Sequence, residues 1–227
     1  MSDIKKFAVL VAGGQGTRMG MALPKQFLPL NGKPILAWSI MAFTQAFPDI
    51  NIILVLPPAY YSYAQMVLTA LPEPIDVTLV SGGETRFHSV KNGLSAIEEE
   101  GIVFVHDGAR PLITTDLLHR CYNDAVTYGS AIPAIPVAES MRIVDGDHSK
   151  PVNRDHMRVI QTPQTFKTEL ILPAFQQEYT PAFTDEATVA EAYGITVHLC
   201  LGEKQNIKVT TPEDMVVAEA FMKAAGN

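Results

Sequence analysis

Hydrophobic residues gather in short, nearly uninterrupted runs along the chain, and amphipathic stretches of helical length lie between them. The runs predict buried strands at residues 6–11, 51–56, 75–80, 102–106 and 195–201. The amphipathic stretches predict helices at residues 34–47, 60–71, 85–99, 114–128, 185–193 and 212–224. Buried apolar strands joined by helical crossovers are typical of an α/β protein. We therefore predict a Rossmann-like, mainly parallel sheet with helices on both of its faces.

This pattern is interrupted between about residues 137 and 158, where polar and apolar residues alternate around a Gly146-Asp147 turn. The alternation predicts a β-hairpin. Because a two-stranded hairpin is only marginally stable alone, we expect this β-arm to protrude and to pack against a partner subunit in a homodimer. No linker, internal repeat or low-complexity segment divides the chain. We expect residues 1–227 to form one domain, with the arm as an insertion.

Composition narrows the classes of function. Of the 227 residues, 47% are hydrophobic and 18% are charged, which is enough apolar material for a large core. The net charge of −7 argues against general binding of nucleic acid or of anionic membranes, but it leaves room for a small anionic substrate. No apolar run approaches the roughly 20 residues of a membrane helix, and no signal peptide is evident. Cys121 and Cys200 lack metal-ligand spacing, so we expect reduced thiols and a cytoplasmic protein.

The strongest local signal is a glycine-rich loop directly after the first predicted strand. Its sequence is AGGQGTRM at residues 12–19, followed by Pro24-Lys25. Glycines at this position allow backbone N–H groups to approach phosphate oxygens closely. Arg18 and Lys25 add positive charge beside the same loop. We interpret the loop as a site for a phosphorylated ligand.

Two common phosphate-binding motifs do not fit this loop. A dinucleotide-binding fingerprint requires a third Gly or Ala where Met19 stands, and an acidic residue at the end of the second strand, where the chain has Leu56-Pro57. A P-loop requires Gly-Lys-Ser/Thr after a four-residue gap, and that sequence is absent. The loop therefore matches neither motif, and an ordinary glycine turn with solvated basic neighbours remains as the alternative to an anion site.

Four later segments, together with this loop, carry a family resemblance. The loop itself resembles sugar-phosphate nucleotidyltransferases in general. The later segments are GGETRFHSV at residues 82–90, HDGARP at 106–111, QTPQ at 161–164 and NIKVT at 206–210. In this order they resemble the 2-C-methyl-D-erythritol 4-phosphate cytidylyltransferases of the non-mevalonate isoprenoid pathway, over about residues 6–222. The resemblance implies a homodimer, a Mg²⁺ requirement, and transfer of a cytidylyl group from CTP to that polyol phosphate with release of pyrophosphate.

The resemblance also implies roles for individual residues. The basic residues that would stabilise the transition state are Arg18, Lys25 and Lys208. The nucleotide would be bound by Ala12, Gly13, Gly14, Gly16, Gly82, Glu84, Ser89 and Asp107, and Asp107 would also bind the metal. The acceptor would be bound by Arg110, Ser140, Arg154, Thr162 and Thr184, with Ser140 and Arg154 reaching across the dimer from the arm. The family commonly has Asp in place of Glu84 and Thr in place of Ser140, and we expect both changes to be tolerated.

Elementary chemistry agrees with these implied roles. Phosphoryl-type transfer needs little covalent chemistry from the protein, so positioning and charge neutralisation dominate. The acceptor phosphate is already an anion at neutral pH, and no nucleophilic side chain is needed.

Three other functions remain as alternatives. A ribitol 5-phosphate cytidylyltransferase would share the scaffold and use a similar acceptor, which binding alone discriminates only weakly. The small Gly108-Ala109 turn favours methylerythritol phosphate, because the ribitol family more often has a bulkier residue there. A hexose 1-phosphate nucleotidyltransferase would share only the first loop. A non-catalytic nucleotide-binding module would lack the cations that Arg18, Lys25 and Lys208 supply.

Overall fold

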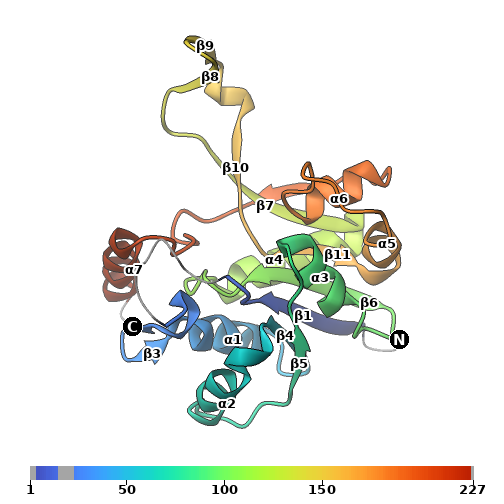
Figure 1. Cartoon of the computed structure of the whole chain (residues 1–227), viewed down its shortest axis with the longest axis vertical. Helices are drawn as coiled ribbons and strands as arrows, with labels where there is room; N and C mark the ends of the chain where they lie inside the picture. Colours follow the sequence, from blue (N-terminus) through green and yellow to red (C-terminus); the bar gives the residue numbers. More distant parts are fainter. Residues whose placement is uncertain (1–3, 15–22, 226–227) are drawn as a thin grey trace.

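A mixed β-sheet forms the centre of the computed structural model, which describes residues 4–14 and 23–225 (Figure 1). Within these residues the sheet has eight strands in the order β10-β7-β11-β6-β1-β4-β5, with β12 paired to β7. The strands are β1 (Lys5–Val11), β4 (Asn51–Leu56), β5 (Val77–Ser81), β6 (Gly101–Asp107), β7 (Ser130–Pro136), β10 (Arg158–Ile160), β11 (Gln164–Lys167) and β12 (Leu199–Leu201). The predicted α/β class is confirmed.

Half of the sheet is the parallel arrangement that the hydrophobic runs predict. Strand β1 pairs in parallel with both β4 and β6, and β4 pairs in parallel with β5. Successive side chains of β1 point to opposite faces, because the side-chain period of a strand is two. Ala8 and Leu10 join one apolar cluster and Val9 joins another, and all three are fully buried.

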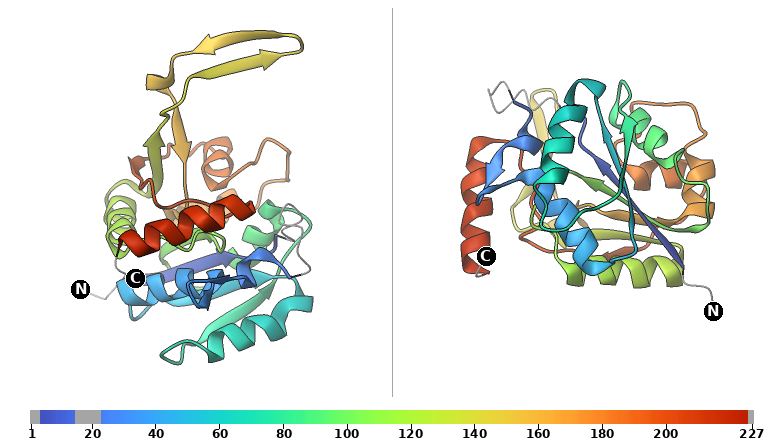
Figure 2. Two further views of the ribbon diagram at one scale, coloured as in Figure 1. Left: turned by 90° about the vertical axis from the view of Figure 1, so that its left-hand side faces the viewer. Right: turned by 90° about the horizontal axis from the view of Figure 1, so that it is seen from below.

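Helices cover both faces of the sheet, as predicted (Figure 2). One face packs against α1 (Ile35–Ala46), α2 (Tyr61–Thr69) and α4 (Thr115–Tyr128). The other face packs against α3 (Arg86–Leu94), α5 (Thr168–Ala174) and α6 (Glu186–Ala192). The predicted helix at 85–99 is shorter than expected, since Thr85 caps it and it ends at Leu94.

In the other half of the sheet, strands β7, β10 and β11 were not predicted. Strand β11 lies antiparallel between β6 and β7, and β10 pairs antiparallel with β7. Strand β7 contains Pro133 and Pro136, which are uncommon inside sheets because proline cannot donate a ladder hydrogen bond. Helix α5 likewise contains Pro173. The strand expected at 195–201 is confined to β12, Leu199–Leu201.

A smaller cluster joins distant parts of the chain. The short strands β2 (Pro29–Leu30) and β3 (Lys33–Pro34) form a hairpin whose turn holds Asn31 and Gly32 at positive φ. Helix α7 (Pro212–Ala224) packs beside this hairpin. The shared apolar residues are Leu30, Ile35, Val209, Ala218 and Met222. Single-turn helices are η2 (Lys25–Phe27), η3 (Pro58–Tyr60) and η4 (Arg154–His156).

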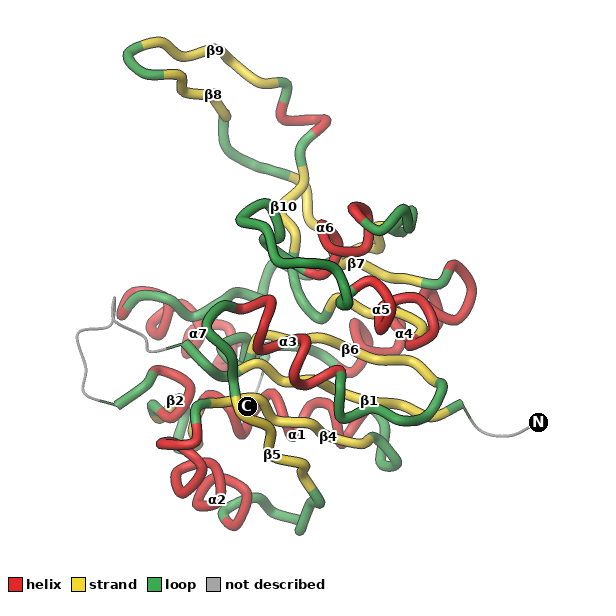
Figure 3. Tube along the Cα trace, turned by 45° about the vertical axis from the view of Figure 1, so that its right-hand side comes forward, coloured by secondary structure: helices red, strands yellow, loops and turns green. Residues whose placement is uncertain are grey.

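The predicted hairpin lies inside residues 137–158 and extends away from the sheet (Figures 1 and 2). It pairs β8 (Met141–Asp145) with β9 (His148–Val152) around Gly146, whose φ is 55°. In Figure 3 the hairpin lies at the opposite end of the molecule from α2. Ile143 and Val144 on β8 are 65% and 71% exposed, which is unusual for such apolar side chains. None of the described helices combines the length and the apolar character that crossing a membrane would require.

Candidate active site

A cavity of about 420 Å³ lies at the carboxyl ends of β1 and β6, beside the loop that precedes α3. Open α/β sheets bind their ligands at this edge. The cavity is lined by Val11, Ala12, Gly13, Gly14, Lys25, Gln26, Gly83, Glu84, Thr85, Arg86, Ser89, Asp107, Gly108, Ala109, Lys208 and Thr210. Most of the nucleotide-binding residues that the sequence singles out therefore meet in one place. Gly16 and Arg18 lie outside the described residues.

Ser89 connects the two glycine-rich segments that face the cavity. Its hydroxyl accepts a hydrogen bond from the Gly83 amide at 3.0 Å and donates to the Thr85 carbonyl at 3.0 Å. A Cβ atom at Gly82 would lie 3.4 Å from this hydroxyl, and one at Gly13 would lie 3.8 Å from it. Gly82 therefore packs behind the cavity and is not part of its lining. The small residues bring two backbone segments together around one buried hydroxyl.

Gly83 is sterically required in this loop. A Cβ atom at that position would lie 2.4 Å from the Cβ atom of His88 and 2.9 Å from its carbonyl carbon. The close approach arises because Thr85 caps α3 by accepting a hydrogen bond from the His88 amide. The cap thus places Glu84, Arg86 and Ser89 at the start of a helix that points at the cavity.

Asp107, the last residue of β6, is the electrostatic centre of the site. Its Oδ1 accepts from Nε of Arg86 at 3.1 Å, and its Oδ2 lies 2.8 Å from Nζ of Lys208 and 3.8 Å from Nε of Arg110. Its backbone amide donates to the Thr162 hydroxyl at 3.1 Å. Burial alone would raise the pKa of Asp107, but the nearby Arg86, Lys208 and Arg110 hold it well below its ordinary value. The carboxylate is therefore ionised at neutral pH.

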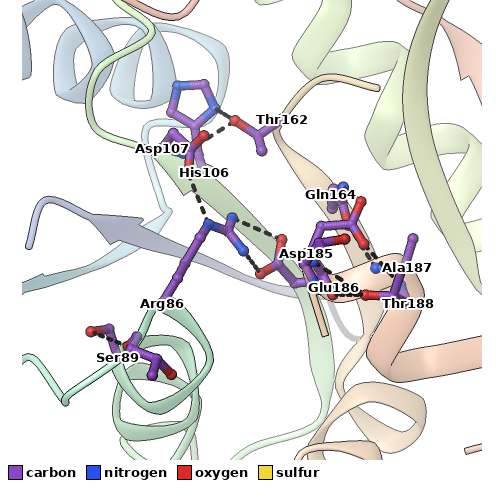
Figure 4. Close-up of polar contacts among 12 residues, drawn as sticks. Arg86, Ser89, His106, Asp107, Thr162, Gln164, Asp185, Glu186, Ala187 and Thr188 are labelled. Carbon is purple, nitrogen blue, oxygen red and sulfur yellow. Dashed lines mark hydrogen bonds and ion pairs between the residues drawn. The ribbon is translucent and has the colours of Figure 1, made fainter. Parts of the chain in front are cut away.

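Arg86 links Asp107 to a second, fully buried carboxylate. Both terminal nitrogens of its guanidinium donate to Glu186, the first residue of α6, while Nε faces Asp107 (Figure 4). Burial would lower the pKa of Arg86, but Glu186 and Asp107 raise it above its ordinary value. The sequence motifs predicted no individual role for either member of this pair. Arg86 lies inside a recognised segment, but an acidic residue in the first turn of a helix is ordinarily explained by the helix dipole.

The loop that carries Lys208 is bound to the turn after β6. The Val209 amide donates to the Ala109 carbonyl at 2.8 Å, and Arg110 donates to the Asn206 carbonyl at 2.8 Å. The buried Asn206 amide donates in turn to the Thr162 carbonyl at 2.8 Å. These bonds explain how a residue late in the chain reaches the end of β6.

Lys25 enters the cavity from the single-turn helix η2. The neighbouring Gln26 is buried and donates to the Ala12 carbonyl at 2.7 Å, which ties this helix to the end of β1. Phe27 packs against the rings of Tyr60 and Tyr63, at centroid distances of 6.0 and 5.6 Å. The position of Lys25 is thus fixed from both sides.

The predicted acceptor residues divide into two groups. Arg110 and Thr162 lie beside Asp107, as described above, whereas Thr184 is exposed on the loop before α6. Ser140 and Arg154 belong to the protruding arm and do not line the cavity of their own chain. Arg154 donates to the Ala138 carbonyl within the arm. A single chain therefore brings only some of the predicted acceptor residues together.

His106 is a buried neighbour of the site. Its Nδ1 lies 3.1 Å from the Thr162 hydroxyl, and its Nε2 lies 3.2 Å from the Arg110 carbonyl. Burial, assisted by the charge of Arg110, lowers the pKa of His106 to about 4. The imidazole is neutral at pH 7 and supports the residues that flank it.

The described residues contain no group of three or more His, Cys, Asp or Glu side chains arranged to hold a metal ion. Two residues with carboxylate side chains, Asp107 and Glu84, line the cavity. Mg²⁺ is commonly bound by one or two carboxylates together with substrate phosphates and water. This pair of carboxylates is a donor set that fits a Mg²⁺ ion arriving with a triphosphate.

Comparison with known proteins agrees with this geometry. The model of the 2-C-methyl-D-erythritol 4-phosphate cytidylyltransferase family matches residues 7–224. The chain belongs to this family. Membership makes it a nucleotidyltransferase that transfers a cytidylyl group to 2-C-methyl-D-erythritol 4-phosphate, as the sequence motifs predict.

Relatives of the family align over nearly the whole chain. The 2-C-methyl-D-erythritol 4-phosphate cytidylyltransferase of Bacteroides thetaiotaomicron is 43% identical over 219 residues, covering 96% of this chain and 100% of that protein. The enzyme of the same name from Geobacillus kaustophilus is 38% identical over 218 residues, covering 95% and 96%. The crystal structure of 4-diphosphocytidyl-2C-methyl-D-erythritol synthase from Anaerococcus prevotii has a TM-score of 0.82 at 26% identity, covering 97% of this chain and 99% of that one. The family enzyme from Thermus thermophilus has a TM-score of 0.73 at 30% identity, covering 95% and 98%.

Proposed function

We propose that the cavity around Asp107 binds CTP and the phosphate of the acceptor, and that Lys25, Lys208 and Arg18 neutralise the charge that gathers during cytidylyl transfer. The single observation that carries this proposal is the convergence of Lys208 and Arg86 on Asp107 beside the glycine-rich loop. Fixed cations next to exposed backbone amides suit a triphosphate. An ordinary surface salt bridge needs no glycine residues around it, whereas the ion pair between Lys208 and Asp107 faces a cavity that is lined by several glycines.

The proposed reaction needs no nucleophile from the protein. An oxygen of the acceptor phosphate forms a bond to the α-phosphorus of CTP, and the bond to the leaving pyrophosphate breaks. Lys25 and Lys208 are proposed to stabilise the transition state, since both line the cavity. The residues proposed to bind the nucleotide are Ala12, Gly13, Gly14, Gly16, Glu84, Ser89 and Asp107, and Gly82 is proposed to support them from behind the cavity.

Asp107 is proposed to hold a Mg²⁺ ion together with phosphate oxygens. When bound, the ion would supply positive charge to the triphosphate. The ammonium group of Lys208 forms an ion pair with Oδ2 of Asp107. When a ligand binds, this group is placed to contact a phosphate oxygen instead of the carboxylate. Arg110, Thr162 and Thr184 are proposed to bind the acceptor within the same chain.

The arm is proposed to complete the acceptor site in a homodimer. Ser140 and Arg154 do not line their own cavity, and apolar side chains on β8 are exposed. A partner subunit would cover these side chains and receive the two polar residues. In this proposal the chain is one nucleotidyltransferase domain with the arm as an insertion. The unbridged thiols of Cys121 and Cys200, 3.8 Å apart, favour the cytoplasm as its compartment.

Pyrophosphate release tests the proposal. The purified protein is incubated with CTP and Mg²⁺, and 2-C-methyl-D-erythritol 4-phosphate and ribitol 5-phosphate are supplied in parallel. We expect release with the methylerythritol acceptor and little with ribitol phosphate. Release only with ribitol phosphate would keep the cytidylyl chemistry but replace the acceptor. Binding of CTP without any release would favour a non-catalytic module instead.

A further inference from the structure

Glu186 is fully buried, and its carboxylate has one cationic partner among the described residues, Arg86. A buried carboxylate is expensive to maintain unless a partner and several hydrogen bonds compensate for its lost hydration. Here both carboxylate oxygens accept from the two terminal nitrogens of Arg86, which is the bidentate geometry that an arginine fork favours. The pair connects the start of α6 to the start of α3, and Arg86 lines the cavity.

The start of α6 is held in place by more than this pair. Asp185 caps the helix by accepting from the Thr188 amide at 2.9 Å. Gln164 on β11 donates to Asp185 at 2.9 Å and accepts from the Ala187 amide at 2.7 Å (Figure 4). Glu186 is therefore attached to the central sheet through its neighbours on both sides. The start of α6 and its hydrogen bonds to Arg86 therefore hold the Glu186 carboxylate in one position.

The fixed carboxylate determines which nitrogen of Arg86 reaches Asp107. Glu186 engages both terminal nitrogens, and Nε is the nitrogen that donates to Asp107, to Oδ1 at 3.1 Å. Oδ2 of Asp107 lies against Lys208, with Nε of Arg110 3.8 Å away. Without Glu186, the terminal nitrogens of Arg86 would be available to form a fork with both oxygens of Asp107. That fork would compete with Lys208.

We infer that Arg86 and Glu186 form a positioning pair, which orients the Asp107 carboxylate so that Oδ2 faces Lys208 and the ligand. The inference deepens the proposed function and rests on the role proposed there for Asp107. Neither member of the pair needs to touch the reacting phosphorus. Groups that orient a functional carboxylate or metal ligand typically contribute about 10- to 100-fold in activity.

The first test removes the pair together. A well-packed apolar pair of similar volume often replaces a buried ion pair without loss of stability. We therefore expect the double variant Arg86→Met/Glu186→Leu to keep its melting temperature, while kcat falls about 10- to 100-fold. Wild-type kcat in the folded double variant would overturn the inference, because Asp107 would then function without the pair.

The second test asks whether the pair acts through Asp107. The same double substitution is made in an Asp107→Asn background, and kcat is compared in a double-mutant cycle. If the pair acts by orienting Asp107, removing the pair from the Asp107→Asn variant should change kcat less than about two-fold. The effects of substitutions that act through one group are not additive. A loss as large as in the wild-type background would overturn the inference and indicate an independent, structural effect.

A milder variant keeps the inference testable if the double variant does not fold. Glu186→Gln preserves volume and one acceptor, but it removes the charge that orients the fork. We expect kcat to fall several-fold in this variant, with a loss smaller than in the double variant. Wild-type turnover in Glu186→Gln would contradict the positioning role.

A matched control variant and the Asp107→Asn variant distinguish failure of the positioning inference from failure of the proposed function. Lys6 is also buried and ion-paired, to Asp49 at 2.7 Å, but it lies at the amino-terminal end of β1, away from the cavity. Lys6→Met should lower the melting temperature and leave kcat unchanged. Full turnover in Asp107→Asn alone would contradict the proposed function of Asp107. A large loss in Asp107→Asn beside full turnover in the folded double variant would contradict only the positioning pair.

Discussion

Lys208 and Asp107 form an ion pair with 2.8 Å between Nζ and Oδ2, and it brings a residue of the late 206–210 segment to the end of β6. The Lys208 side chain is 40% exposed, whereas that of Asp107 is only 10% exposed. The ammonium group is thus held over the cavity while it remains accessible to a ligand. Because Asp107 already orders the Lys208 side chain, binding a ligand there would cost less conformational entropy than binding to a mobile lysine.

Lys25 is predicted to be essential for turnover but not for folding. Lys25→Ala should lower kcat at least about 100-fold, as expected when a cation is removed from developing charge, with a melting temperature close to that of the wild type. Steady-state pyrophosphate release and thermal unfolding measure the two effects. Lys33→Ala is a suitable control, since Lys33 lies over the Trp38 ring and outside the cavity. Near-normal activity in Lys25→Ala would remove Lys25 from the mechanism.

The buried His106 predicts a specific pH dependence of stability. Its pKa in the folded state is about 4, whereas an unfolded histidine titrates near 6.5. Between these values the unfolded state binds more protons, so stability is full above about pH 6.5 and falls as the pH drops toward 4. The contribution of this one group is on the order of 3 kcal/mol over the window.

Chemical unfolding of the ligand-free and metal-free protein at several pH values tests this dependence. His106→Asn should be less stable than the wild type at pH 7, but its free energy of unfolding should change less between pH 6.5 and 4. Parallel curves for the two proteins would show that another group causes the acid sensitivity.

Mixing two inactive variants tests whether the arm completes the neighbouring site. Arg154→Ala damages the arm, and Lys25→Ala damages the cavity. In a symmetric dimer with exchanged arms, a mixed pair has one fully intact site, so random mixing should restore about a quarter of the wild-type activity. The variants are unfolded and refolded together, and each is also refolded alone. If mixing restores no activity although mixed dimers form, the arm serves its own chain or no site at all.

Close packing at Gly93 predicts a defect in the scaffold beneath the site. A Cβ atom there would lie 2.6 Å from Val9 Cγ1 and 2.7 Å from Val55 Cγ2. Both valines are stiff, β-branched side chains that cannot easily move aside. Gly93→Ala should therefore lower the free energy of unfolding by about 1–3 kcal/mol, despite the higher helix propensity of alanine.

Denaturant unfolding of three variants checks this explanation. Lys91→Ala in the same helix is the control and should change stability by less than about 0.5 kcal/mol. Adding Val9→Ala to Gly93→Ala should recover part of the loss if the clash is the cause. A stability equal to that of the wild type in Gly93→Ala would mean that α3 moves away from the sheet at little cost.

The parallel half of the fold could be predicted from the sequence because its strands are continuous apolar runs, as in β4 and β6. The antiparallel half could not, since β7 contains two prolines and β10 is only three residues long. Its strands depend on pairing partners that are distant in sequence, which local pattern does not encode.

The candidate site shows the same division. Ser89, Asp107 and Lys208 stand in recognisable segments and meet at the cavity, as expected. Glu186 was missed because only the folded chain brings it to Arg86. Its single sequence signal was a position at the start of a predicted helix, which many exposed acidic residues share.

The packing of α7 against the β2–β3 hairpin has a consequence for the order of events during synthesis. The hairpin follows directly after η2, which carries Lys25, while Val209 of the same apolar cluster adjoins Lys208. A ribosome-bound chain that has completed β1, β4 and β6 already contains the parallel centre of the sheet. It still lacks Lys208, and it lacks the residues of α7 that pack against the hairpin next to Lys25. Substrate binding is therefore expected to begin only after nearly the whole polypeptide has emerged from the ribosome.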